Sequence, residues 1–304
     1  MIAFLQVLLD AISLGSLYAL IALGLGLLIN ILRLINFAHG DFITVAGFSL
    51  IVPSSGAAAS MFVGNFHWLP LVVIVCAIVV MVALVCDFAV FRHFRKADPG
   101  TLMAASFGLS YFIQNALMVI YGSRPKGINL WPELSGNLTF GGLRLPVLQL
   151  VIIAVTMGLM VGLHLFLKKT RWGLHTRAAA SDFAMARHLG VRGNFVIGLA
   201  LAISGLLAAI SGLLYVSQTG SLTTTLGVPL ALFAFVAAVV GGLGSLLGSV
   251  VGGYLIGITL VLLQVYLPSE LRPFREAITF GLVLLLLVLR PQGLFPSHVM
   301  TERV

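Results

Sequence analysis

The stretch LRLINFAHGDF, residues 32–42, interrupts an otherwise apolar N-terminal region. Some thirty almost wholly apolar residues precede it, and apolar sequence resumes directly after it. Within about ten positions it places an Arg, an Asn, a His, a Gly and an Asp. This polar interruption predicts that a long apolar helix ends here and that the chain changes direction before the next one.

The composition of the chain indicates an all-α polytopic membrane protein. It has 304 residues, 60% hydrophobic and only 9% charged, with a mean hydropathy of +1.13. A soluble domain carries about 25% charged residues, so this chain has too little polar surface for a water-soluble globule. Helices are expected, because backbone groups in lipid must be satisfied within the segment. We interpret residues 1–304 as a single membrane domain.

Apolar runs of about 20 residues are long enough to cross the hydrocarbon layer as helices. A shorter run, residues 229–240, is interpreted as a half-helix or part of a broken hairpin, because a glycine-rich break follows it. We therefore expect eight to ten crossings. The expected full spans are residues 7–31, 41–63, 70–91, 102–121, 147–167, 195–217, 249–267 and 276–290.

The distribution of basic residues predicts the orientation. One set of loops holds twelve of the 17 Lys and Arg residues, and the opposite loops hold five. The positive-inside rule places the richer set in the cytoplasm, which puts the N-terminus outside and the C-terminus inside. This topology favours nine crossings and explains the net charge of +8 without nucleic-acid binding. The larger set is Arg33, Arg92, Arg95, Lys96, Lys168, Lys169, Arg171, Arg177, Arg187, Arg192, Arg290 and Arg303.

The sequence contains no recognisable catalytic motif. It has no phosphate-binding GxxxxGK[ST], no HExxH and no nucleophile elbow. We therefore expect neither enzymatic activity nor a bound metal or cofactor. Asp87 lies near the inner end of its span, five residues before Arg92, and is interpreted as one half of an ion pair. With few acids deep in the bundle, energy for transport is expected from outside the chain.

Two patterns of small or polar residues recur at four-residue spacing. Ser106, Ser110 and Gln114 form one polar stripe, which either bonds to a neighbouring helix or lines a translocation path. Gly244, Gly248 and Gly252 allow close helix packing, as do Gly253 with Gly257 and Ser204 with Ala208 and Gly212. The alternative is that the glycine break, Gly241, Gly242, Gly244 and Gly248, is a flexing point or a backbone-lined path.

The largest predicted inner loop, residues 169–194, is expected to hold a short amphipathic helix. Ser181 can cap it, and Gly190 can end it in the left-handed conformation. Asp182 near its start and Arg187 near its end suit the helix dipole. From physics alone such a helix either lies on the membrane or docks into a partner. The hydroxyl-rich outer loop SQTGSLTTTLG, residues 217–227, either contacts a partner, lines an entrance or is simply solvated.

Four stretches resemble the branched-chain amino-acid ABC transporter permease family. They are LYALIALGLGLLINILRLINFAHGDF (17–42), RAAASDFAMARHLGV (177–191), LFAFVAAVVGGLGS (232–245) and LVLLLLVLRPQGLF (282–295). The resemblance implies an importer of the bacterial inner membrane. Its expected partners are a second homologous permease, two cytoplasmic ATPase subunits that bind ATP, a periplasmic binding protein and membrane lipid.

The resemblance also assigns expected roles to particular residues. It implies that the inner loop is the segment that couples to the ATPase, with Phe183 and Leu189 as buried anchors. The expected coupling residues are Ala178, Ala179, Ser181, Asp182, Phe183, Ala186, Arg187, Leu189 and Gly190. It makes Asn36, Phe37, His39, Gly40 and Asp41 a family-motif corner. On physical grounds Gly40 is expected to turn the chain, and Asn36, His39 and Asp41 to bond backbone freed by the break.

The substrate does not follow from the side chains. Branched-chain amino acids are expected from the resemblance, and urea, short amides and small carboxylates are the alternatives. A self-contained channel or secondary transporter is a competing class, but the sequence has no charged filter ring. A purely structural membrane subunit would leave the polar stripe and the glycine break without a purpose.

Overall fold

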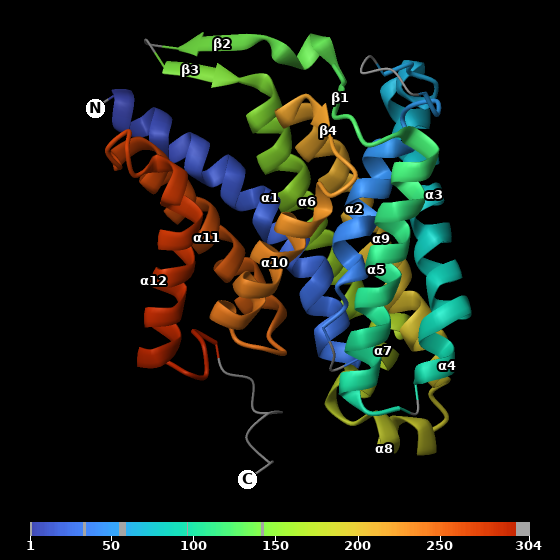
Figure 1. The fold of residues 1–304 in the computed structure, drawn as a ribbon. Coiled ribbons are helices and arrows are strands. Elements are labelled where there is room, and N and C mark those ends of the chain that lie inside the picture. The colour runs from blue at the N-terminus through green and yellow to red at the C-terminus, as the bar shows by residue number, and fades with distance from the viewer. Residues whose placement is uncertain (1, 33–34, 55–58, 96, 141–142, 296–304) are drawn as a thin grey trace. The chain divides into compact units, whose positions relative to one another are not determined.

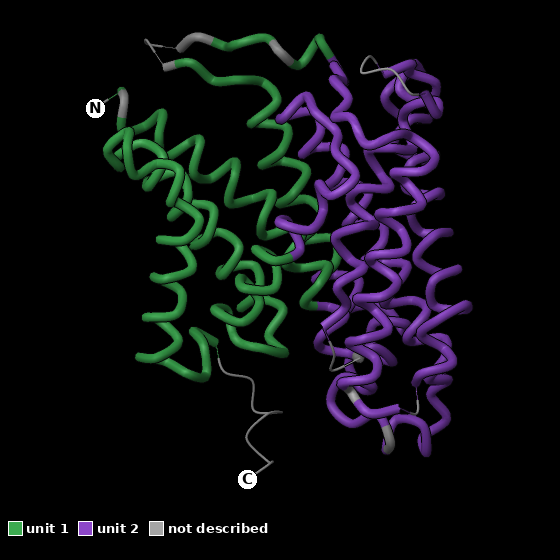
Figure 2. The backbone as a smooth tube through the Cα atoms, in the orientation of Figure 1, with its two compact units in different colours: residues 1–26, 132–163, 232–304 green, residues 27–131, 164–231 purple. Residues whose placement is uncertain are grey.

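The computed structural model describes residues 2–32, 35–54, 59–95, 97–140 and 143–295. Arg33, Lys96 and Arg303 of the predicted inner charge set lie outside these residues. The described chain is mainly helical and divides into two compact units (Figures 1 and 2). Unit 1 contains residues 1–26, 132–163 and 232–304, and unit 2 contains residues 27–131 and 164–231. Helices α1, α6 and α10 contribute to both units.

Six helices in the described residues are long and apolar enough to cross a membrane. They correspond to six of the predicted spans, and their ends lie within a few residues of the predictions. Among the shorter helices of the described residues are α2 (Ala38–Phe48), α10 (Gly227–Gly241) and α12 (Arg275–Leu289). The long helices are α1 (Ile2–Leu32), α3 (Trp68–Cys86, continuing to Phe94), α5 (Pro99–Tyr121), α6 (Val147–Lys169), α9 (Gly193–Thr219) and α11 (Leu246–Tyr266).

The predicted span 41–63 is wrong in length. Helix α2 has 11 residues, which at 1.5 Å per residue is about 16 Å, half of a hydrocarbon core. Pro53 follows soon after, and it lacks an N–H and disfavours helical backbone at Val52. The chain continues through an isolated bridge between Ile51 and Met61 and a 3-10 turn, Val63–Asn65.

Unit 2 is built around α2. This short helix packs against α3, α5 and α9 (Figure 1), and ten of its eleven residues are buried. Gly212 on α9 meets the α2 backbone, because an added Cβ would lie 2.7 Å from the Ile43 carbonyl oxygen. This confirms close packing on the Ser204–Ala208–Gly212 face. Strands β1 (Lys126–Gly127) and β4 (Ser221–Leu222) pair antiparallel in the same unit.

The chain departs from regular α-helix after the end of α3 in unit 2. Residues Asp87–Phe91 form a π-helical turn, which a three-residue helix, α4 (Arg92–Phe94), continues. Beyond α6 the chain forms two further helices of unit 2, α7 (Arg171–Ser181) and α8 (Phe183–His188). In Figure 1, α4, α7 and α8 lie at the same end of this unit.

Unit 1 is held together by glycine contacts along α11. A Cβ on Gly253 or Gly257 would collide with the backbone of α1 at Ala19 or Gly15, and one on Gly252 would collide with α10 at Ala237. The predicted close packing is therefore confirmed. Strands β2 (Asn137–Phe140) and β3 (Leu143–Pro146) add an antiparallel hairpin to this unit.

The predicted glycine break is confirmed as a tight turn between α10 and α11. Gly242 and Gly244 have φ values of +109° and +88°, a region that favours glycine. The Ser245 hydroxyl then accepts a hydrogen bond from the Gly248 N–H at 3.0 Å and caps α11. Gly244 lies in the turn, so the helical glycine face begins only at Gly248, which packs against Gly241.

Candidate functional site

The family-motif corner connects α1 to α2, and α5 holds it in place. The Asn36 amide oxygen accepts a hydrogen bond from the Ala38 N–H at 3.1 Å, as predicted for backbone freed by the break. The Ser106 hydroxyl of α5 accepts one from the Phe37 N–H at 3.3 Å. Phe37 also packs edge-on against Phe107, with ring centroids 6.1 Å apart.

The structure places His39 and Gly40 in contacts that the sequence did not predict. His39 is fully buried, and its Nδ1 lies 2.9 Å from the Ser204 hydroxyl of α9. Gly40 lies inside α2 and does not turn the chain. Its lack of a side chain admits the start of α10, because an added Cβ would lie 2.3 Å from the Gly227 carbonyl oxygen.

Asp41 is the most unusual residue of the corner. It is 1% exposed, and neither carboxyl oxygen has a hydrogen-bond partner among the described residues. This contradicts the predicted bond to freed backbone. The side chains of Ser110 and Gln114 face the carboxyl group, but the Gln114 amide instead donates to the Ser110 hydroxyl at 3.0 Å.

The polar stripe on α5 therefore faces the interior of unit 2. Ser106 is 0% exposed and Ser110 is 7% exposed, so the chain itself covers both, and neither contacts lipid. Of the two predicted roles, a bond to a neighbouring helix or the lining of a translocation path, only the half-buried Gln114 fits the second in this conformation, because it alone of the three reaches open space. Ser106 has a structural task in the corner, and Ser110 and Gln114 remain path candidates.

A cavity of about 430 Å³ opens beside Gln114. Most of its polar wall comes from the hydroxyl-rich loop that the sequence singled out, through Thr219, Ser221, Thr223 and Thr225. Its apolar wall includes Leu226, Val228 and Pro229, where α10 begins. We call this space the outer cavity. Of the alternatives considered for the loop, lining an entrance agrees best with this arrangement.

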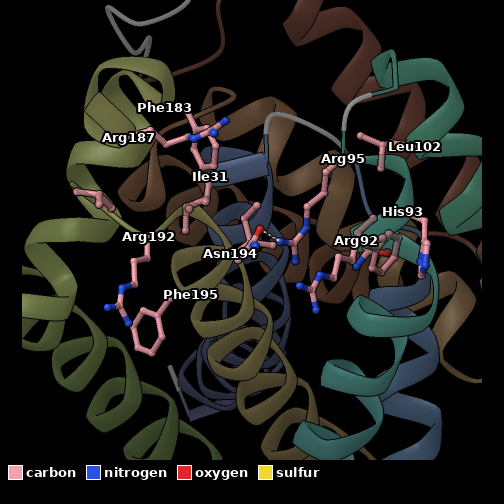
Figure 3. A pocket seen from close by; sticks show the side chains of 15 residues that line it. Ile31, Arg92, His93, Arg95, Leu102, Phe183, Arg187, Arg192, Asn194 and Phe195 are labelled. Atoms are coloured by element: carbon pink, nitrogen blue, oxygen red, sulfur yellow. Dashed lines mark hydrogen bonds between the residues drawn. The ribbon is translucent and has the colours of Figure 1, made fainter. Parts of the chain in front are cut away.

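A larger cavity of about 1120 Å³ lies at the end of unit 2 that holds α4 and α8 (Figure 3). We call it the basic cavity, because Arg92, Arg95, Arg187 and Arg192 line it. Arg95 points toward Asn194 and bonds to its side-chain oxygen (Figure 3). Asn36 of the family-motif corner also lines this cavity, so the corner forms part of the cavity wall.

The predicted ion pair of Asp87 is confirmed, with Arg95 as its partner. Arg95 Nη2 donates to Asp87 Oδ1 at 2.6 Å and also contacts Oδ2. Both side chains are largely buried, at 15% and 12% exposure. The pair spans the π-helical turn, and π-turns of this kind occur often at functional sites.

Two helices, not one, form the predicted coupling segment. Thr170 caps α7, and its hydroxyl accepts from the Gly173 N–H at 2.9 Å. Ser181 ends α7 and does not cap the next helix. The cap of α8 is Asp182, whose carboxylate accepts from the Met185 N–H at 2.9 Å. Ser and Asp both cap helices well. The sequence does not show where α7 ends and α8 begins, so it could not distinguish Ser181 from Asp182 as the cap.

The end of α8 agrees with the prediction. Gly190 has a φ of +87°, the left-handed conformation expected there. Its N–H donates to the Arg187 carbonyl at 3.1 Å, and the Val191 N–H donates to Ala186 at 3.0 Å. These bonds satisfy carbonyls that the helix end leaves open.

The predicted anchors of the coupling segment differ in exposure. Leu189 is 77% exposed and Met185 is 56% exposed. Phe183 is half-buried and lies against Gly193, where it lines the basic cavity. Ala179 and Ala186 are buried, and Ala178 is half-buried. The outward apolar surface is therefore formed by Met185 and Leu189, and Phe183 is an internal contact.

Sequence reasoning missed Thr44, Gly227 and Asn194. The Thr44 hydroxyl accepts from the Gly227 N–H at 2.9 Å, which fixes the start of α10 on α2. These residues are far apart in the chain, so no local pattern could pair them. Among the described residues, no group of His, Cys, Asp or Glu side chains is placed to hold a metal ion.

Comparison with known proteins gives matches over nearly the whole chain. The chain is 31% identical over 298 residues to the high-affinity branched-chain amino acid transport system permease protein BraD of Pseudomonas aeruginosa, covering 96% of this chain and 95% of that protein. It is 32% identical over 301 residues to the permease protein LivH of the same kind of system in Escherichia coli K12, with the same coverage.

A more distant relative is the autoinducer 2 import system permease protein LsrC of Yersinia enterocolitica. It is 33% identical over 134 residues, which cover 42% of this chain and 36% of that protein. No solved structure matches the chain significantly. The family described as the permease component of branched-chain amino acid transport systems matches residues 7–289. This chain is a polytopic membrane protein that belongs to the family of branched-chain amino acid transport system permeases.

Proposed function

We propose that this chain is the transmembrane permease subunit of an ATP-driven importer in the bacterial inner membrane, and that it moves branched-chain or similar hydrophobic amino acids. The observation that carries the proposal is the match over 96% of the chain to permeases named for those substrates. The chain itself is not an enzyme in this proposal. ATP is bound and hydrolysed by two cytoplasmic ATPase subunits, a second homologous permease completes the membrane part, and a periplasmic binding protein delivers the substrate.

The exposed surface of α8 supports the coupling role. Met185 and Leu189 give it an apolar face, and Arg187 lies beside them at the rim of the basic cavity. A helix with exposed apolar anchors is suited to lie in a groove of a partner protein. The arginines of the cavity suit acidic side chains of the same partner. In this arrangement, movement of the ATPase reaches the corner through Arg95, Asp87 and Asn36.

The proposed orientation of the chain in the membrane follows from the basic residues at the end of unit 2 that holds α4, α7 and α8. The basic residues of α4, α7 and α8 face the cytoplasm according to the positive-inside rule. The N-terminus then lies in the periplasm and the C-terminus in the cytoplasm. The outer cavity, at the hydroxyl-rich loop, faces the binding protein.

The substrate is tested by competition in cells. The chain is expressed with the second permease, the ATPase subunits and the binding protein in a strain that lacks its own branched-chain amino-acid importers, and uptake of radiolabelled leucine is measured. We expect uptake that excess isoleucine and valine suppress and that urea and acetamide leave unchanged. Absence of leucine uptake together with uptake of urea, an amide or a small carboxylate would contradict the proposed substrate. The relative named for autoinducer 2 import makes such a different solute the alternative to test.

A further inference from the structure

The carboxyl group of Asp41 is buried inside unit 2. Both of its oxygens are enclosed, and no donor among the described residues reaches either with good hydrogen-bond geometry, although the side chains of Ser110 and Gln114 lie against it. Burying an ionised carboxylate without a partner is very costly. A group this expensive at 1% exposure indicates a partner that the chain alone does not supply.

The outer cavity lies next to this carboxyl group. Gln114 faces Asp41 and also lines the cavity, so one side chain connects the two. The backbones are joined as well, because Gly40, next to Asp41, packs on Gly227 at the start of α10. Gln114 therefore stands between the carboxyl group and the cavity.

The other wall of the outer cavity has the opposite chemistry. Thr223 and Thr225 supply hydroxyl donors, and α10 begins there with the partial positive charge of a helix N-terminus. None of the described residues that line the cavity is acidic or basic. Leu226 and Val228 give it an apolar surface, and about 430 Å³ lies within the range of small-molecule sites.

We propose that Asp41, Ser110 and Gln114 bind the α-ammonium group of a zwitterionic amino acid on its way through the membrane. The α-carboxylate of the substrate is received by the hydroxyls of Thr223 and Thr225 at the start of α10, and its aliphatic side chain by Leu226 and Val228. The proposal rests on the proposed function as an amino-acid importer and adds a selection step within the membrane. It excludes urea, amides and simple carboxylates, because these lack the ammonium group.

The test uses the complete importer in proteoliposomes with its binding protein. Asp41→Asn keeps the shape of the side chain and removes its charge. We expect leucine uptake to fall at least about tenfold, because a hydrogen bond to a charged group is lost. Stimulation of ATP hydrolysis by loaded binding protein should remain. Asp41→Glu should recover part of the uptake, and Glu270→Gln, the same chemical change at an exposed carboxylate, should leave it unchanged.

A stability measurement separates this role from a structural one. Asp41→Asn should melt at or above the temperature of the unaltered protein, because it removes an unpaired buried carboxylate. Unchanged uptake in Asp41→Asn, or a loss of uptake that follows a loss of thermal stability, would overturn the inference. If the unaltered importer does not transport leucine at all, the proposed function fails first, and the two failures are thereby distinguished.

Discussion

Gly40 and Gly227 bring the backbones of α2 and α10 into direct contact. A Cβ added to Gly40 would lie 2.3 Å from the Gly227 carbonyl oxygen, and one added to Gly227 would lie even closer to the Gly40 carbonyl. The neighbouring hydrogen bond from the Gly227 N–H to the Thr44 hydroxyl, at 2.9 Å, fixes the same junction. The family motif therefore joins two short helices where neither has room for a side chain.

Replacing Gly40 with Ala should destabilise the protein. The added methyl group forces α2 and α10 apart, and overpacking of this kind typically costs about 1–3 kcal/mol. We expect a melting temperature lower by several degrees in detergent, measured by intrinsic fluorescence. The matched control is Gly108→Ala on α5, where an added Cβ meets nothing within 4 Å. Equal melting temperatures for the two variants would contradict the close contact.

The outward surface of α8 should be required for attachment of the ATPase. Leu189→Asp places a charge on the most exposed apolar side chain of the segment. We expect the variant to insert and to pair with the second permease, but to lose most of the ATPase during co-purification. Leu138→Asp, at an exposed Leu on β2 of unit 1, is the control. Full retention of the ATPase by Leu189→Asp would rule out this helix as the coupling element.

The Asp87–Arg95 pair should stabilise the π-helical turn beside the basic cavity. Arg95→Ala leaves Asp87 largely buried without its cation, and we expect a loss of about 1–3 kcal/mol, below the full cost of breaking an entirely buried pair. Asp87→Asn with Arg95→Gln should lose less than the sum of the two single changes. Thermal melts of the unaltered protein, of Asp87→Asn, of Arg95→Gln and of the double variant measure this difference. Strict additivity would show that the pair contributes nothing.

The start of α5 should respond to acid. The Asp98 carboxylate accepts hydrogen bonds from the Thr101 N–H at 3.1 Å and from its hydroxyl at 2.8 Å, which lowers the pKa of Asp98 below its ordinary value of 3.8. A lowered folded pKa means that the stabilisation is complete above pH 3.8 and is lost as the pH falls through the lower value.

Hydrogen exchange at the Thr101 amide measures this effect. After correction for the intrinsic rate, its protection should be constant above pH 3.8 and fall below it. In Asp98→Asn, which keeps a capping side chain without a titrating group, protection should not change with pH. A fall in protection that begins near neutral pH, or one that is equal in both proteins, would contradict this role of the cap.

The long helices could be predicted from the sequence because their signal is local. The expected span 102–121 is α5, Pro99–Tyr121, and its start carries a visible Asp-Pro capping pattern. The end of α2 could not be predicted from hydropathy, because apolar residues such as Ile51 continue beyond Phe48. The local signal there is Pro53, which disfavours helical backbone at Val52.

The candidate site was only partly predictable, because many of its contacts join residues that are far apart in the chain. The sequence singled out His39, Asp41 and Gln114 as unusual polar residues in an apolar chain. It could not show that His39 reaches Ser204, 165 residues away, or that neither carboxyl oxygen of Asp41 has a hydrogen-bond partner with good geometry among the described residues. Asp182 rather than Ser181 caps α8 because α7 ends at Ser181. The two candidate caps are adjacent and both cap well, so the sequence does not show which of them begins the second helix.

The central claim, ATP-driven import through this chain, is tested most directly by transport in proteoliposomes. The two permeases and the two ATPases are reconstituted with ATP inside, and binding protein with radiolabelled leucine is added outside. We predict that leucine accumulates above its outside concentration only when both ATP and binding protein are present, and that a non-hydrolysable ATP analogue does not support accumulation. Equilibration without ATP, or accumulation driven by a proton gradient alone, would contradict the account.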